Sequence, residues 1–374
     1  MQSDNERMIA DTVQRIFTDN ITHAVRAHAE AGQVPEGIWR VITENGLHLA
    51  LASADAGGSE LTWHDAYPIL RGIGYWQVPV PLAETLVAAA LLSDAGINVP
   101  EGPMTLIEVG RHDGLHLQRD AQTLILQGRA VNVPWASVAR WAVISAHVHE
   151  VPATELPRIA LIDLAQEGVI VSAGRTVAGE PQGELKFDAV PTTATATYPS
   201  TYLSEPVLSL GALARSAMIV GALEAALHES VTYANDRVQF GRPIGKNQAI
   251  QQSLAEMAGE VLSARMATEV AFTSMSDSGR AHSRQFDVAV AKVRASESAT
   301  RVSSIAHQVH GAIGFTHEHA LHFATRRLWA WRKDFGSDAF WANRLGHAAI
   351  QAGSEGFWPA LTDRSLLAQT IAPY

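Results

Sequence analysis

The stretch DRVQFGRPIGKNQAI, residues 236–250, stands between two long segments whose apolar residues recur at helical spacing. Arg237 and Arg242 offer planar guanidinium groups that bind phosphate oxygens in pairs. Gly241 lets a ligand approach the backbone closely, and Phe240 adds a flat apolar face. The stretch therefore predicts a site for a phosphate-bearing ligand at a helix–helix corner. The alternative is an ordinary corner whose charges are only solvated, since short motifs recur by chance.

The composition excludes several classes of function. The chain has 374 residues, of which 47% are hydrophobic and 18% charged, as in folded proteins with more than one core. The net charge of −10 and the lack of a long basic run disfavour a nucleic-acid surface. The absence of cysteine excludes disulfides, thiolate metal sites and thiol nucleophiles. The sequence shows no secretory signal and no uninterrupted apolar run of roughly 18 residues, so we expect a cytoplasmic protein without a membrane span.

Hydrophobic periodicity divides the chain into three parts. Residues 1–102 carry apolar residues at helical spacing and predict an N-terminal helical domain. Residues 103–205 carry short apolar runs separated by Pro, Gly and Thr, which predict a middle β-barrel-like domain. Residues 206–374 return to long helical patterns with Ala-rich faces, which predict a C-terminal four-helix bundle. The expected fold class is therefore α+β and multidomain.

Two motifs, together with the order of the domains, resemble the acyl-CoA dehydrogenase family over nearly the whole chain. RVQFGRPIGKNQAI, residues 237–250, is similar to the family's Arg-x-x-Phe-Gly-x-x-Ile segment. QVHGAIGFT, residues 308–316, is similar to its Gln-x-x-Gly-Gly-x-Gly-aromatic segment. GELKFDAV, residues 183–190, is similar to the strand that closes the β-domain. Two separated motifs in the expected order make the resemblance specific.

The resemblance implies FAD chemistry on an acyl-CoA thioester. In this family a carboxylate removes the α-proton, a hydride leaves the β-carbon for the flavin, and the electrons pass to an electron-transfer flavoprotein. The helical bundle holds the adenosine and pyrophosphate of an FAD whose ring lies in the neighbouring subunit. We call the matching positions of this chain the clasp residues, and they are Arg237, Gln239, Phe240, Ile244, Asn247, Ile250, Gln308, Val309, Gly311 and Ala312.

Neither position at which the family carries its catalytic base holds an acid here. In the commoner arrangement a Glu-Gly-Thr follows the Gly-rich segment; Gly336-Ser337 match its last two residues, which puts Phe335 in place of the glutamate. In the other arrangement the glutamate lies on the first bundle helix, and the count leads to Gly211. Asp334 is one residue out of register and one methylene shorter, so it is the fallback base if the backbone shifts. The alternative is a solvated or helix-capping aspartate beside Lys333.

The loops of the β-domain that face the flavin also depart from the family. The family's Thr-Glu-Pro-x-Ala-Gly-Ser-Asp loop has no counterpart between Pro103 and Gly128. Its Trp-(Ile/Val)-(Thr/Ser)-Asn segment matches NVPW, residues 132–135. Pro134 therefore stands where a hydroxyl donor would meet the flavin, and proline has no donor to offer. By this comparison the flavin-ring half of the site is lost while the clasp is kept.

This asymmetry resembles the heteromeric α₂β₂ acyl-CoA dehydrogenases of steroid side-chain catabolism. Their base-lacking subunits have endings similar to FTHEHALH, residues 315–322, and RRL, residues 326–328. We interpret the chain as a non-catalytic subunit that supplies the clasp, while a second acyl-CoA dehydrogenase-like subunit supplies the glutamate. Two alternatives stay open. One is a self-sufficient homo-oligomeric enzyme that uses Asp334; the other is an assembly protein that binds neither FAD nor thioester.

A group of five histidines between His307 and His322 invites a metal site. His319 and His322 have i,i+3 spacing, but in the sequence Glu318 is the only carboxylate beside them. We therefore predict packing roles for these side chains and no metal site.

Overall fold

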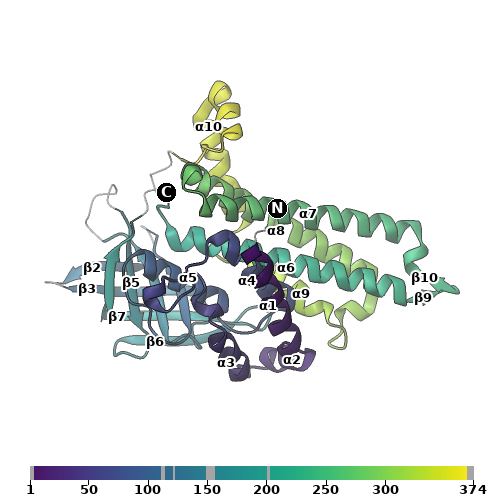
Figure 1. The fold of residues 1–374 in the computed structure, drawn as a ribbon, viewed down its shortest axis with the longest axis horizontal. Coiled ribbons are helices and arrows are strands. Elements are labelled where there is room, and N and C mark those ends of the chain that lie inside the picture. The colour runs from purple at the N-terminus through teal and green to yellow at the C-terminus, as the bar shows by residue number, and fades with distance from the viewer. Residues whose placement is uncertain (1–3, 111–113, 121–122, 149–155, 200–202, 369–374) are drawn as a thin grey trace.

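The computed structural model describes residues 4–110, 114–120, 123–148, 156–199 and 203–368. Helices come first along the chain, two β-sheets follow, and long helices return at the end, in the order that the sequence predicts (Figure 1). The N-terminal helices are α1 (Asp4–Asn20), α2 (His23–Glu30), α3 (Glu36–Glu44), α4 (Trp63–Trp76) and α5 (Leu82–Asp94).

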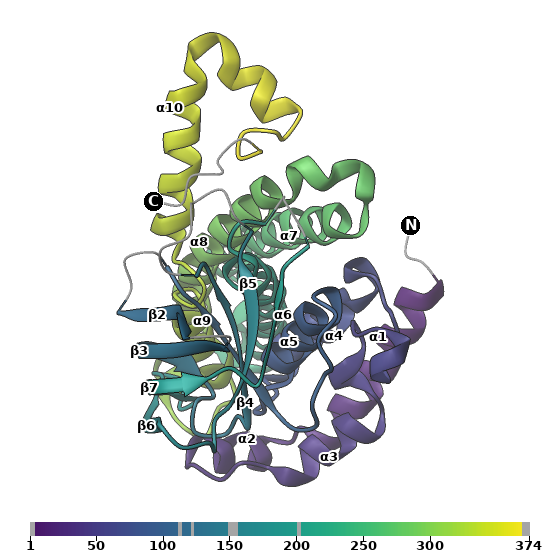
Figure 2. The ribbon, with the colours of Figure 1, turned by 90° about the vertical axis from the view of Figure 1, so that its left-hand side faces the viewer.

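Local capping explains where two of these helices begin. The Thr22 hydroxyl accepts a hydrogen bond from the N–H of Val25 at the start of α2, and the Thr62 hydroxyl accepts one from the N–H of Asp65 at the start of α4. Helix α5 is apolar nearly all round, and its residues 82–92 are buried. It packs against α6 of the C-terminal helices and β1 of the first sheet, so nearly all of its faces are covered (Figure 2).

The middle domain is a pair of four-stranded sheets. One sheet has the order β1 (Met104–Glu108), β4 (Trp141–Ala146), β5 (Arg158–Asp163) and β8 (Ala194–Thr197). The other has the order β2 (Leu115–Asp120), β3 (Thr123–Pro134), β7 (Pro181–Pro191) and β6 (Val169–Arg175). Side chains from both sheets, among them Leu126, Ile144 and Phe187, share one apolar core. Among the described residues the strands do not close into a barrel, so the domain is two packed sheets.

The bundle consists of three long helices, α6 (Pro206–Asp236), α7 (Gln248–Ser276) and α8 (Arg284–His310), and the shorter helix α9 (Leu321–Trp331). Helix α6 is its core. By length and composition alone α6 could cross a membrane, but 94% of its most apolar window is buried inside the protein, so packing accounts for its composition. Helix α10 (Asp338–Thr362) follows and bends at Gly353, whose φ is 70°. It stands off the bundle as an arm (Figure 2).

The N-terminal domain and the bundle meet backbone to backbone. A Cβ atom at Gly74 of α4 would lie 1.8 Å from the carbonyl oxygen of Met218 on α6. A Cβ atom at Gly221 of α6 would lie 2.0 Å from the carbonyl oxygen of Arg71 on α4. Only glycine fits at both positions, because no neighbouring side chain can move to make room. This crossing fixes the position of α6 relative to the first domain.

Candidate functional site

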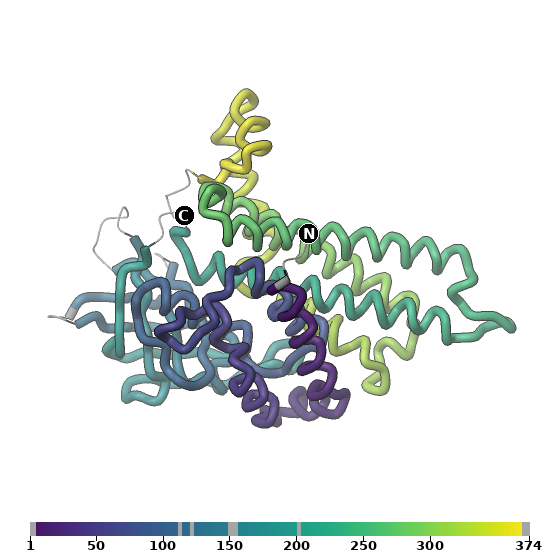
Figure 3. Tube along the Cα trace, in the orientation of Figure 1, coloured from purple at the N-terminus to yellow at the C-terminus, as the bar shows by residue number. Residues whose placement is uncertain are grey.

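The clasp residues gather at one end of the bundle, far from the β-sheets (Figure 3). Ile244 follows the turn between α6 and α7, Ile250 lies in the first turn of α7, and Val309 lies in the last turn of α8. These three side chains pack in one small apolar cluster with Ala234. The two sequence motifs are thus brought together in space by a local apolar contact.

A tight hairpin forms the tip of this end. Strands β9 (Val238–Gln239) and β10 (Arg242–Pro243) pair with Gln239 opposite Arg242. Phe240 and Gly241 make the turn with φ values of 51° and 79°. Positive φ at both central residues is the geometry of a type I′ hairpin turn, which is strained for phenylalanine. The Phe240 side chain is fully exposed, at 102% of its reference area, and points away from the chain's own core.

Polar clasp residues surround the hairpin. The N–H of Ile244 donates to the carbonyl of Arg237 over 2.9 Å, and the guanidinium of Arg242 donates to the side-chain oxygen of Asn247 over 2.9 Å. The side chains of Arg237 and Gln239 are exposed. On the facing segment Gln308, Gly311 and Ala312 are exposed as well.

Gly311 ends α8 in a conformation that suits glycine. Its φ is 63° and its ψ is −142°. A Cβ atom there would meet nothing within 4 Å, so the backbone conformation and not the available space requires glycine.

The histidines beside the clasp are packing residues in the described part of the chain. The ring of His310 stacks on Tyr233 at 4.6 Å, and the ring of His307 stacks on Phe315 at 4.3 Å. Burial lowers the pKa of both imidazoles, so they are neutral at pH 7. Among the described residues no group of three or more His, Cys, Asp or Glu side chains is placed to hold a metal ion.

The two positions predicted for the missing base lie against each other. Phe335 lies on the loop between α9 and α10, and its ring covers Gly211 of α6. A Cβ atom at Gly211 would lie 2.4 Å from Cδ1 of Phe335. The two places predicted for a catalytic base therefore share one space in the structure, and the ring of Phe335 occupies it.

Asp334 is held as a counter-ion. Its carboxylate accepts from Nε of Arg215 over 3.0 Å and from the amide of Gln182 over 3.3 Å. Arg215 also donates to Glu84 over 2.5 Å, and both of these side chains are almost wholly buried. Burial opposes the charge of Arg215, but the Glu84 and Asp334 carboxylates outweigh it and raise the pKa of Arg215. Asp334 is therefore neither solvated beside Lys333 nor a helix cap.

Lys292 of α8 holds the backbone of the Phe335 loop by hydrogen bonds. Its ammonium group donates to the carbonyls of Arg332 and Gly336 over 2.9 and 2.8 Å. The indole N–H of Trp341 donates to the carbonyl of Phe335 over 2.9 Å. Burial lowers the pKa of Lys292 to about 7. These contacts leave the loop little freedom to bring Asp334 into the place of Phe335.

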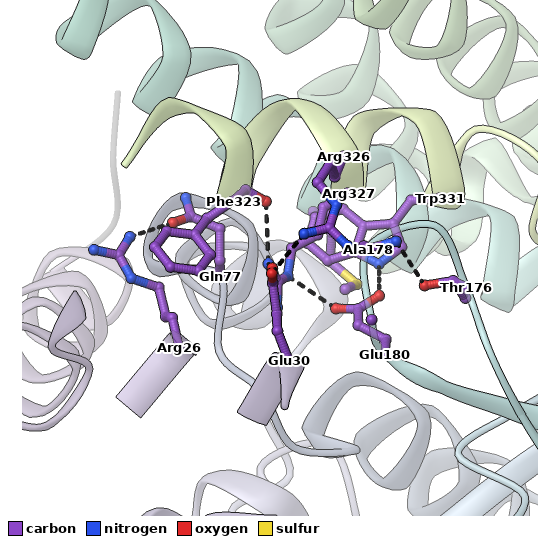
Figure 4. A network of polar contacts seen from close by, with 12 residues as sticks. Arg26, Glu30, Gln77, Thr176, Ala178, Glu180, Phe323, Arg326, Arg327 and Trp331 are labelled. Atoms are coloured by element: carbon purple, nitrogen blue, oxygen red, sulfur yellow. Dashed lines mark hydrogen bonds and ion pairs between the residues drawn. The ribbon is translucent and has the colours of Figure 1, made fainter. Parts of the chain in front are cut away.

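A buried group of ion pairs and hydrogen bonds connects the bundle to the N-terminal domain and the β-domain (Figure 4). Arg327 of α9 pairs with Glu30 of α2 over 3.2 Å and with Glu180, between β6 and β7, over 3.0 Å. Arg326 pairs with Glu30 over 2.6 Å, and the indole of Trp331 donates to Glu180 over 2.7 Å. The Arg326-Arg327 pair, which the sequence offers only as a resemblance, therefore ties the bundle to both other domains.

An open pocket of about 350 Å³ lies between the β-sheets and the bundle. Its lining includes Glu108, Asn132, Pro134, Leu208 and Phe335. Asn132 sits at a bulge of β3 with a φ of 55°. The pocket therefore joins the altered NVPW segment to the position of the missing base.

Glu108 is the residue of this pocket that the sequence analysis missed. Its carboxylate accepts from the N–H of Leu208, in the first turn of α6, over 2.8 Å. Burial and the nearby Glu205 carboxylate raise the pKa of Glu108 well above its ordinary value, against hydrogen bonds from Leu208, Ser145 and Val207. The signal in the sequence is an acid placed directly after the apolar run of β1.

The pocket and the clasp lie at opposite ends of α6. Leu208 is in its first turn and Asp236 is its last residue. At 1.5 Å per residue the two ends are about 40 Å apart. One dinucleotide cannot contact both sites of the same chain.

Comparisons with known proteins agree with this architecture. Residues 201–349 match the model of the acyl-CoA dehydrogenase C-terminal domain, and residues 3–97 match that of the N-terminal domain. Acyl-CoA dehydrogenase IpdE2 of Mycolicibacterium smegmatis is 27% identical over 335 residues, which is 87% of this chain and 92% of that protein.

Two solved structures are similar over nearly the full length. The ChsE4-ChsE5 complex of Mycobacterium tuberculosis gives a TM-score of 0.85 at 21% identity, over 94% of this chain and 98% of the matched chain. A variant of the Tcur3481-Tcur3483 steroid ACAD gives 0.83 at 26% identity, over 93% and 99%. With both terminal domains matched, this chain belongs to the acyl-CoA dehydrogenase family of oxidoreductases, which act on CH–CH bonds.

Proposed function

We propose that this chain is the non-catalytic subunit of a heteromeric, FAD-dependent acyl-CoA dehydrogenase. The observation that carries the proposal is the contact between Phe335 and Gly211. Both places for a base are occupied by residues without an acid, and they fill each other's space. A second dehydrogenase-like subunit then supplies the glutamate that removes the α-proton.

The role of this chain is to clasp the adenosine and pyrophosphate of FAD. The residues at the hairpin end fit that group: Arg237 and Arg242 suit a diphosphate, and Gln239, Asn247 and Gln308 suit ribose and adenine. FAD accepts the hydride when it is bound. The chain's own part is to hold the charged end of the cofactor.

The ring of that FAD lies in the partner subunit. The distance of about 40 Å along α6 separates the clasp from the chain's own pocket. The positive φ of Phe240 at the exposed hairpin tip supports the same arrangement, because strained backbone is concentrated at sites that contact a ligand or a partner.

The proposed partners and substrate follow from the family and from the relatives. Electrons leave through an electron-transfer flavoprotein, and the substrate is an acyl-CoA thioester. One of the similar structures is a steroid ACAD, which favours a steroid or lipid acyl group and a cytoplasmic degradation pathway.

The test is the flavin content of the assembled complex. The chain is co-expressed with a dehydrogenase-like partner that carries the glutamate, and FAD is counted per complex. We expect half as many flavins as chains, and we expect Arg237→Ala to remove most of the FAD. Arg119→Ala, an exposed arginine of β2, is the matched control. Unchanged FAD in the Arg237→Ala complex would refute the clasp and favour the assembly-protein alternative.

The second candidate is a self-sufficient enzyme that uses Asp334. It predicts that the chain purified alone is yellow and that an acyl-CoA bleaches it. The contacts of Asp334 disfavour this candidate, because both oxygens of its carboxylate already accept hydrogen bonds, one from Arg215 and the other from Gln182.

A further inference from the structure

Two aromatic rings lie across the end of the bundle that carries the clasp residues. Tyr233 is in the last turn of α6, and His310 is the last residue of α8. Their rings are stacked, with centroids 4.6 Å apart and an angle of 22° between the two planes. The stack therefore joins the two helix ends from which the clasp motifs project.

The backbone of each stacked residue holds a clasp residue directly. The N–H of Arg237 donates to the carbonyl of Tyr233 over 2.8 Å. Gly311 follows His310 in the chain, and its N–H donates to the carbonyl of His307 in the same last turn of α8. A shift of either ring therefore displaces the backbone of the neighbouring clasp residue.

The ring of His310 is held in one orientation. Its Nδ1 donates to the carbonyl of Ala306 over 2.8 Å. The ring of His319 lies edge-on to it, with centroids 4.6 Å apart. Its Nε2 is buried and has no hydrogen-bond partner among the described residues. The stack on Tyr233, and not a second hydrogen bond, therefore locates this side of the imidazole.

The apolar cluster around the stack is small. Its buried members in the described part of the chain are Ala234, Ile244 and Val309. An aromatic pair stabilises a contact beyond the apolar area that it buries. In a cluster of this size the stack is a substantial part of the contact between the two helix ends.

We propose that Tyr233 and His310 are positioning residues for the clasp, because their stack fixes the distance between Arg237 and Gly311. This inference rests on the proposed function. His310 is only 3% exposed, so it acts through Gly311 and not by contact with FAD. Hydrogen bonds to phosphate need donors at defined distances and angles, and a displacement of about 1 Å weakens them. The clasp therefore holds FAD tightly only while the two helix ends keep their spacing.

The first test is the FAD dissociation constant of the complex, which is assembled by co-expression with a partner that carries the glutamate. His310→Ala and Tyr233→Ala should each raise this constant roughly 2- to 10-fold, the range of one aromatic pair. His310→Phe keeps a ring on Tyr233 and should restore wild-type FAD binding. Unchanged FAD binding in either alanine variant, or a His310→Phe complex as weak as the His310→Ala complex, would overturn the proposal.

The second test is a double-mutant cycle on the same dissociation constant. Tyr233→Ala and His310→Ala remove the two halves of one stack, so the loss should occur only once. The double variant should bind FAD about as weakly as the weaker single variant. Two effects that multiply in the double variant would show that the rings act separately, and this would overturn the proposal.

His48 of the N-terminal domain is a matched control for the loss of stability. It is half-buried, its Nδ1 is buried without a hydrogen-bond partner among the described residues, and its ring makes an edge contact with Trp39 at 6.1 Å. His48→Ala and His310→Ala should both lower the free energy of unfolding of the isolated chain. Only His310→Ala should weaken FAD binding by the complex. Equal weakening in the His48→Ala complex would assign the effect to general stability and overturn the proposal.

The Arg237→Ala complex separates this inference from the clasp itself. If Arg237→Ala removes FAD and His310→Ala does not, only the positioning role is refuted. If the Arg237→Ala complex keeps its FAD, the clasp is refuted, and the positioning role is refuted with it.

Discussion

The ring of Phe335 lies so close to Gly211 that a methyl group at residue 211 would sit 2.4 Å from Cδ1 of Phe335. These two residues are far apart in the sequence, and each stands at a position that the sequence analysis matches to one of the two family places for the base. Neither residue is an acid, and the ring of Phe335 fills the space beside Gly211. The wall of the pocket is apolar where the chemistry would need a carboxylate.

Gly211→Ala should destabilise the chain by about 1–3 kcal/mol, because the added methyl group meets the base of the Phe335 ring and the backbone of α6 cannot yield. In a Phe335→Ala background the same change should cost nothing. A urea double-mutant cycle measures the coupling. Gly259→Ala, on the open face of α7, is the control and should stabilise the chain by about 1 kcal/mol. Equal costs of Gly211→Ala in both backgrounds would contradict the contact.

Arg215→Met should be the more damaging change at the buried ion pairs. It leaves Glu84 and Asp334 without their cation, and an unpaired buried charge typically costs about 3–5 kcal/mol. Chemical unfolding of the purified chain measures this loss. Arg140→Met, which breaks an exposed pair with Asp163, should change stability by at most about 1 kcal/mol. A small effect of Arg215→Met would show that the carboxylates are neutral or reached by water.

Asp334→Asn should leave the turnover of the assembled complex unchanged. Asparagine keeps the shape of the side chain and a hydrogen bond with Arg215, whereas loss of a true catalytic base would cost about 10²- to 10⁴-fold in rate. Steady-state dehydrogenation of an acyl-CoA measures the difference. A fall of that size, with normal FAD content and normal folding, would favour the self-sufficient alternative.

Acid should weaken the clasp end of the bundle. Burial lowers the pKa of His310 in the folded chain below its ordinary value of 6.5. Between these two pKa values the imidazole is protonated in the unfolded chain and neutral in the folded chain. The free energy of unfolding should therefore fall as pH drops below about 6.5. His310→Phe, which keeps the stack on Tyr233, should flatten this part of the pH profile. An unchanged slope in the variant would assign the acid sensitivity to other groups.

Lys292 should give a second, separate pH effect. Its pKa is lowered from 10.5 to about 7, so between these values the unfolded chain binds more protons than the folded chain. The free energy of unfolding should rise as pH increases from about 7 toward 10.5. Lys292→Met should remove this rise and loosen the Phe335 loop, because the carbonyls of Arg332 and Gly336 lose their donor. Hydrogen exchange of the loop amides measures the loosening.

Much of the fold was accessible from the sequence. Helical spacing and short β runs predicted the order of the elements, because each periodicity reflects which faces of a helix or strand are buried. The corner between α6 and α7 was predicted as well, because turn chemistry is local, but the two paired strands that form it were not. The barrel-like closure of the middle domain was not decided in this way: whether two sheets close depends on strand pairings between distant segments, and here they stay separate.

Some features of the candidate site follow from the sequence, and others only from the tertiary structure. The lack of an acid at residues 211 and 335 is a property of the sequence alone. Glu108 and the pairing of Arg215 with Glu84 and Asp334 are properties of the tertiary structure, because they depend on side chains brought together from three domains. Whether Asp334 could act as a base was therefore open in the sequence. The tertiary structure pairs Asp334 with the buried Arg215, because a charge removed from water needs carboxylates close to it. This pairing disfavours Asp334 as the base.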